Sequence, residues 1–199
     1  RQGKEEAILK EAVELCLKDG KWDSISLPVC VKKMTELSWS LSRRLFQGKG
    51  YNQIDPIFLF LQRQCPHIQS MEFSFDLGVD DQILQLITAF PLKKLRIDSC
   101  EAVKKEGLKA LQKLNQLEEL QLSGLILQGD ESVATMGTLS SLRRLSLPNL
   151  HIRNEDYSFL KTLSSLRSLD LYYAGVNDEA LRYIVAACPQ LSSLLVSSG

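Results

Sequence analysis

The chain has 199 residues, of which 44% are hydrophobic and 24% are charged, and its 24 Lys and Arg residues are balanced by 24 Asp and Glu residues. This balance excludes a whole-protein attraction to nucleic acid or to an anionic membrane, and no apolar run reaches the roughly 18 residues of a membrane-spanning helix. The length suits one domain, or one domain with a helical appendage.

Five cysteines are spread along the chain, at Cys16, Cys30, Cys65, Cys100 and Cys188. Their odd number, and the lack of any Cys-x-x-Cys pair, favour free thiols in a reducing compartment over a disulfide framework. We therefore expect an intracellular protein, located in the cytoplasm, the nucleus or both.

Residues 1–66 carry helical patterns. A first helix is expected from Lys4 to Lys18, where helix-forming residues dominate before Asp19-Gly20. A second, amphipathic helix is expected from Leu27 to Leu45, because its apolar residues recur every three or four positions. A shorter helix is expected to begin at Asp55-Pro56. The sequence therefore predicts an N-terminal helical region over residues 1–66.

One motif then recurs along residues 67–199, with apolar residues at its first, fourth and sixth positions. Its clearest copies, residues 142–147 and 166–171, both read Leu-x-x-Leu-x-Leu. The six copies start at nearly equal intervals, at Ile68, Leu92, Leu117, Leu142, Leu166 and Leu191. This motif at a fixed period of about 20–29 residues is the sequence signature of a leucine-rich repeat.

The motif predicts an α/β solenoid over residues 67–199. Each copy is expected to form a short strand whose leucines point inward, and the apolar residues between copies have helical spacing. About six repeats would place parallel strands on a concave face and helices on a convex face, with the helical region as a cap. Val196 ends the last strand, and we expect further repeats, a partner protein or a second copy of the chain to cover this end.

The last repeat carries a more specific resemblance. Its motif Leu-Arg-Ser-Leu-Asp-Leu at 166–171 is followed by Cys188-Pro189-Gln190-Leu191, and Cys65-Pro66-His67-Ile68 has the same form. The segment resembles the cysteine-containing subclass of leucine-rich repeats that is typical of F-box-associated substrate receptors. The internal cysteine position of that subclass is filled by Cys100 alone, with Leu or Ala elsewhere. The resemblance implies a substrate receptor of a cullin-type ubiquitin ligase.

Residues suited to catalysis are sparse. The two histidines, His67 and His151, lie in different repeats, and the chain has no glycine-rich phosphate-binding motif. The acidic and basic pairs alternate along the expected concave face, so no continuous basic stripe for nucleic acid forms. We therefore expect no catalytic site, cofactor or metal, and a non-enzymatic protein that binds other proteins.

The expected concave face supplies the candidate binding residues. Arg and Tyr are enriched at protein-binding hot spots. Seven outward positions combine these residues with a central carboxylate: Arg96, Arg143, Arg144, Arg167, Asp170, Tyr172 and Tyr173. These side chains either bind a partner protein or form a solvated surface in which Asp170 pairs with a neighbouring arginine.

Two further alternatives stay open from the sequence. The helices of residues 1–66 either cap the first repeat or bind a ligase adaptor. The repeats themselves either recognise a partner for ubiquitylation or form the sensor or autoinhibitory domain of an innate-immune receptor, although repeats of that class are commonly longer than the repeats of this chain.

Overall fold

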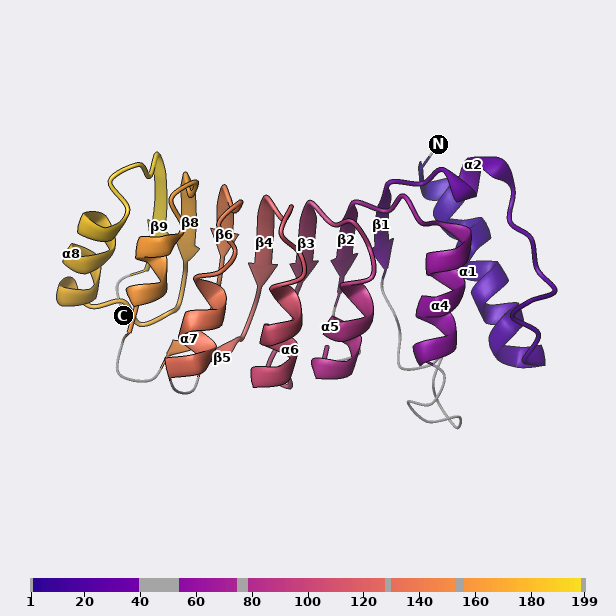
Figure 1. The fold of residues 1–199 in the computed structure, drawn as a ribbon, viewed down its shortest axis with the longest axis horizontal. Helices are drawn as coiled ribbons and strands as arrows, with labels where there is room; N and C mark the ends of the chain where they lie inside the picture. The colour runs from indigo at the N-terminus through magenta and orange to yellow at the C-terminus, as the bar shows by residue number, and fades with distance from the viewer. Residues whose placement is uncertain (1, 40–53, 75–78, 128–129, 153–155, 198–199) are drawn as a thin grey trace.

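The computed structural model describes residues 2–39, 54–74, 79–127, 130–152 and 156–197 (Figure 1). Seven parallel strands form one sheet, and their order in the sheet follows their order in the chain. They are β1 (Glu36–Trp39), β2 (Ser70–Phe73), β3 (Lys94–Ile97), β4 (Glu119–Leu122), β6 (Arg144–Ser146), β8 (Ser168–Leu171) and β9 (Ser193–Val196). Two short strands, β5 (Ile126–Leu127) and β7 (His151–Ile152), pair in a second sheet.

Helical segments follow the strands and stack side by side along one face of the sheet (Figure 1). They are α4 (Ile54–Gln64), α5 (Asp81–Ile87), α6 (Lys105–Leu111), α7 (Asp130–Met136), the 3-10 helix η3 (Ser158–Thr162) and α8 (Asp178–Ala187). Asp80 and Asn177 are the N-cap residues of α5 and α8, and the side chain of each accepts a hydrogen bond from a backbone N–H of the first turn. The predicted α/β solenoid is therefore confirmed.

The core lies between the sheet and the helices, and the repeated leucines build it. One line of side chains crosses all seven strands in register: Leu37, Met71, Leu95, Leu120, Leu145, Leu169 and Leu194. Six of the seven are buried, whereas Leu194 on the terminal strand is half-buried. Since the strand period is two, their neighbours in sequence point to the opposite face, on which no helix of the described residues lies.

Over its described residues, 27–39, the expected helix from Leu27 to Leu45 is confirmed at Val29–Lys32 and wrong elsewhere. Helix α2 spans Val29–Lys32 alone, and the chain then forms strand β1, which pairs with β2. Leu37 therefore joins the core line of the sheet beside Met71. Residues 40–45 of the expected helix, with Leu41 and Leu45, lie outside the described residues.

Helix α1 (Gln2–Asp19) covers the outer edge of β1 (Figure 1). The Ser38 backbone N–H donates a hydrogen bond of 3.1 Å to the Glu6 carboxylate, which satisfies an edge donor that would otherwise pair with another strand. Leu9 and Val13 of α1 are buried. The first helix therefore shares the hydrophobic core of the sheet.

Neighbouring repeats are also joined through their helices. The Asp81 carboxylate on α5 accepts a hydrogen bond of 2.6 Å from the Lys104 backbone N–H at the start of α6. A Cβ atom at Gly107 would lie 2.9 Å from the Asp81 Cα atom, so only glycine lets the two helices approach this closely.

Three cysteine thiols are buried within separate repeats and contact backbone carbonyls. The Sγ atoms of Cys65, Cys100 and Cys188 lie 3.5, 3.8 and 3.5 Å from the carbonyl oxygens of Val31, Ile97 and Leu160. Burial raises the pKa of Cys65 to about 11 and that of Cys100 to about 12, and it also raises the pKa of Cys188. These thiols are therefore protonated at neutral pH, whereas Cys30 is exposed.

Candidate functional site

The sheet face opposite the described helices, called the open face below, is the candidate binding surface. Its side chains alternate with the core residues and come from every strand. A groove of about 440 Å³ runs over β2, β3, β4, β6 and β8. The hollowed surface is the one that the sequence predicted to be concave, and it is polar across its middle.

A shared carboxylate joins three strands in the middle of the groove. Glu119 on β4 forms ion pairs with Lys94 on β3, at 3.0 Å, and with Arg144 on β6. Burial disfavours the charged carboxylate, but the hydrogen bonds and positive charges of Arg144 and Lys94 outweigh it and lower the pKa of Glu119. Arg144 therefore already has an anionic partner within the fold.

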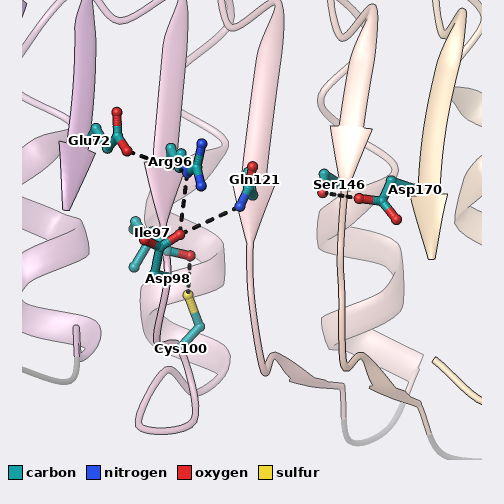
Figure 2. Close-up of polar contacts among 8 residues, drawn as sticks. All are labelled: Glu72, Arg96, Ile97, Asp98, Cys100, Gln121, Ser146 and Asp170. Carbon is teal, nitrogen blue, oxygen red and sulfur yellow. Dashed lines mark hydrogen bonds and ion pairs between the residues drawn. The ribbon is translucent and has the colours of Figure 1, made fainter. Parts of the chain in front are cut away.

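Arg96 on β3 is held in a similar way (Figure 2). Its Nε atom lies 3.5 Å from the Glu72 carboxylate and 3.3 Å from the Asp98 carboxylate. Gln121 on β4 donates a hydrogen bond of 3.5 Å to the same Asp98 oxygen. The Arg96 guanidinium is thus oriented across the face by two carboxylates.

Arg143 and Arg167 lie next to each other at the amino ends of β6 and β8, where the Arg167 backbone N–H donates to the Arg143 carbonyl oxygen at 2.9 Å. The side chain of Arg143 lies 4.0 Å from Glu118, a loose ion pair between exposed groups. Arg167 donates to the backbone carbonyl oxygens of Ser164 and Leu166, at 3.4 and 3.1 Å. Both guanidinium groups remain exposed to solvent.

Among the described residues, Asp170 forms no ion pair with an arginine. One of its carboxylate oxygens accepts a hydrogen bond of 2.8 Å from the Ser146 hydroxyl on β6, as Figure 2 shows. The other oxygen accepts a hydrogen bond of 3.0 Å from the Tyr172 backbone N–H. Asp170 therefore fixes the turn that presents the two tyrosines.

Tyr172 and Tyr173 form a ring pair just after β8, with ring centroids 4.2 Å apart and an interplanar angle of 53°. The hydrogen bond to the Tyr173 side chain raises the pKa of Tyr172. Tyr173 has a backbone φ of 55°, and its N–H donates to the Ser197 hydroxyl at 2.9 Å. A left-handed backbone costs a non-glycine residue about 1–2 kcal/mol.

Of the seven predicted residues, Arg96, Arg144 and Asp170 line the groove, and the seven do not form one cluster. Arg143, Arg144 and Arg167 lie near the amino ends of their strands, whereas Tyr172 and Tyr173 follow the carboxyl end of β8. Five positions separate Arg167 from Tyr172, which corresponds to roughly 16 Å along an extended strand. Arg96 lies three strands from Asp170, on the far side of the groove.

Leu195 is an open-face residue that the seven candidates do not include. It lies on β9 in register with Asp170, and 51% of its side chain is exposed. The alternation of the last motif already places position 195 outward. The sequence therefore predicts that Leu195 points outward, but a single aliphatic residue among serines does not indicate a binding role.

A search of the described ranges finds no group of three or more His, Cys, Asp or Glu residues placed to hold a metal ion. Within the same ranges, no helix combines the length and the hydropathy that crossing a bilayer requires.

Replacing Glu119 with Gln is expected to lower the free energy of unfolding at pH 7 by up to about 1 kcal/mol, since the ion pairs are partly solvated. The folded protein holds the pKa of Glu119 below its unfolded value, so this stability is present above the unfolded pKa of about 4.3 and is lost as pH falls through the folded pKa. Urea unfolding of both proteins between pH 3 and pH 7 measures the difference.

Glu11→Gln on the exposed surface of α1 is the matched control, and its effect should vary little over this range. A Glu119→Gln difference that is equally large at pH 3 and pH 7 would contradict the shared ion pair.

The repeats of this chain are similar in sequence to those of one known protein family. The family model for the leucine-rich repeats of the FBD-associated F-box protein At5g56370 matches residues 106–199, just under half of the chain. No curated protein matches the chain in sequence. Among solved structures, internalin C2 from Listeria monocytogenes shares 14% identity with a TM-score of 0.49, over 97% of this chain and 86% of the internalin chain.

The family match rests on the same residues that build the sheet. Its range contains the motif copies that form β4, β6, β8 and β9, and in each the apolar positions point inward. The nearly constant period, one strand per motif and the helical return segments together define the architecture. The described residues therefore have the architecture of a leucine-rich-repeat solenoid, and residues 106–199 are similar in sequence to the repeats of that F-box protein.

Proposed function

We propose that the chain is a non-enzymatic recognition module that binds a partner protein on its open face. The observation that carries the proposal is the groove, which spans five strands and is lined by side chains held in place by mutual ion pairs and hydrogen bonds. A solenoid presents such an extended surface without a deep cavity, which suits a protein ligand better than a small substrate.

The more specific proposal is a substrate receptor of a cullin-type ubiquitin ligase. Its support is the match of residues 106–199 to the repeats of an F-box protein, together with the Cys188-Pro189 junction of the last repeat. An intracellular location is part of this proposal. The fold alone hosts many binding functions, so the ligase role rests on this resemblance.

We also propose that residues 1–66 act as a cap for residues 67–199. The supporting contacts are the pairing of β1 with β2 and the contacts of the Phe58 ring with the rings of Phe73 and Phe90, whose centroids are 6.3 and 6.5 Å away. These contacts bury apolar side chains that would otherwise be exposed at the first repeat, as solenoid ends require.

Photo-cross-linking tests the recognition face. With p-benzoylphenylalanine in place of Ser168 in the groove, the protein is expected to form discrete protein adducts in cells, whereas the same residue in place of exposed Lys109 on α6 is not. Tyr172→Ala and Arg144→Glu should each weaken binding of the recovered partner by about 1–3 kcal/mol, while Lys104→Glu on the helical side changes it little. Equal adducts from both positions would contradict recognition by the open face.

The ligase proposal has its own measurement. The full-length protein should co-purify with a cullin scaffold, and the partner cross-linked at position 168 should be ubiquitylated by that complex. A partner that is recovered repeatedly without any cullin component would retain the recognition role and exclude the ligase role.

A further inference from the structure

Tyr173 adopts a backbone conformation that its side chain disfavours. The corresponding positions of the two preceding repeats are Gly124, with a φ of 71°, and Asn149, with a φ of 55°. Gly and Asn are the residues that commonly adopt left-handed backbone, whereas a bulky aromatic residue there is strained. The solenoid therefore needs the conformation at this position but does not need a tyrosine.

The tyrosine also gains little from burial within the chain. Tyr173 is 62% exposed and Tyr172 is 41% exposed, although their two rings contact each other. Leu195, 51% exposed, lies on the adjacent strand in register with Asp170, two positions before Tyr172. These three residues, called the aromatic corner below, place an apolar surface at one end of the otherwise polar open face.

The polar groups around the corner determine what it can bind. Each carboxylate oxygen of Asp170 accepts one hydrogen bond within the fold, from the Ser146 hydroxyl and from the Tyr172 N–H, so these contacts hold the carboxylate in place. The exposed cation Arg167 precedes the amino end of β8, about 16 Å away along the strand, and the exposed cation Arg143 precedes the neighbouring strand β6. A ligand that covers the corner and also meets these cations must be elongated and must carry separated apolar and acidic groups.

We propose that the aromatic corner anchors an aliphatic or aromatic side chain of an extended protein segment, and that Arg143 and Arg167 bind an acidic residue about five positions away in that segment. The inference rests on the proposed recognition function and names the chemistry of its partner. The strain at Tyr173 is retained because a rigid ring, already oriented by its backbone and by Tyr172, loses little freedom when it contacts the ligand.

Selected peptides provide the probe. A displayed library of random peptides is selected on the whole chain, and the most enriched peptides are synthesised with a fluorescent label for anisotropy titration. The enriched sequences should share an aliphatic or aromatic residue with Asp or Glu four to six positions away. Arg143→Gln combined with Arg167→Gln should weaken their binding about tenfold, and more so at low salt.

Tyr173→Asn separates a binding role from a structural role, because its two effects have opposite signs. It should weaken peptide binding about tenfold or more, since it removes the anchor ring. It should also raise Tm by about 2–4 °C, because it relieves the strained backbone. Asn149→Gly, at the same repeat position and without a ring, should leave the Kd within about twofold, and Tyr173→Phe should keep most of the affinity.

The results for the substituted proteins test the aromatic corner and recognition by the open face separately. Peptides that are weakened by Arg144→Glu in the groove but are indifferent to Tyr173→Asn would overturn the anchor and retain recognition by the open face. A lower Tm for Tyr173→Asn would also overturn it, since the ring would then be structural. Peptides insensitive to every open-face change, or no enrichment at all, would count against both proposals.

Discussion

Replacing Leu145 or Leu169 with Ala is expected to lower the free energy of unfolding by about 2–5 kcal/mol. Both side chains are 1% exposed and lie side by side in the core line that crosses the sheet. Each substitution removes buried apolar area and leaves a cavity, because the neighbouring repeats hold the strands at fixed spacing. Urea unfolding at equilibrium, with the two variants compared to the unchanged protein, measures the loss.

Leu194→Ala is the matched control for register. It occupies the same line on the terminal strand β9 but is half-buried, so its substitution should cost clearly less than that of Leu169. Losses below about 1 kcal/mol at both Leu145 and Leu169 would mean that the motif leucines do not point into the core.

Phe60→Ala is expected to cost about 3–5 kcal/mol, the range for a fully buried aromatic side chain. Phe60 on α4 has no exposed surface, and its ring meets Trp22 edge to face. The loss should appear as one cooperative transition if the proposed cap and the solenoid share a core. Chemical denaturation followed by both tryptophan fluorescence and far-ultraviolet circular dichroism measures it.

Leu59→Ala, one residue earlier on the same helix, is the control. Its side chain is 53% exposed, and its substitution should change stability by no more than about 0.5 kcal/mol. Two separate transitions in the Phe60 variant, one by each probe, would show that residues 1–66 fold independently and would contradict the cap.

The strands of residues 68–196 were predictable because leucine spacing and strand register follow the same rule. Residues inward at every second position line up across repeats of constant length, as Leu120, Leu145 and Leu169 do. Strand β1 was missed although Met34, Leu37 and Trp39 have the motif spacing. The interval from Met34 to Ile68 is longer than that between any two later copies, and the apolar residues from Leu27 onward also fit a helical period.

The physical reason for the strand at Leu37 is not local. The edge of β2 offers backbone partners, and α1 supplies Glu6 for the opposite edge of β1, so tertiary contacts outweigh the local helical pattern. Neither the β2 strand nor Glu6 lies within the stretch of sequence around Leu37 from which the helical pattern was inferred. Local pattern therefore predicts elements well where repeats are regular and poorly where an insertion interrupts them.

The candidate site was predictable as a face but not as a set of contacts. Alternation places Arg144 and Asp170 outward, and the structure agrees. Side-chain partners depend on which neighbour is within reach, and Arg144 reaches Glu119 on β4 while Asp170 accepts from Ser146. The left-handed backbone of Tyr173 follows from its turn, in which the equivalent positions of the two preceding repeats are Gly124 and Asn149.

The reactivity of the buried thiols can report local opening of individual repeats. Cys65 lies just before the first regularly spaced motif copy, Cys100 lies in the second repeat and Cys188 just before the last copy, and each is protonated and buried. An alkylating reagent can reach each sulfur only after its own repeat opens, so the three modification rates report three local opening equilibria. Because each repeat contacts only its neighbours, comparing the modification rates of the three cysteines shows whether unfolding begins at one end of the array or occurs in all repeats together.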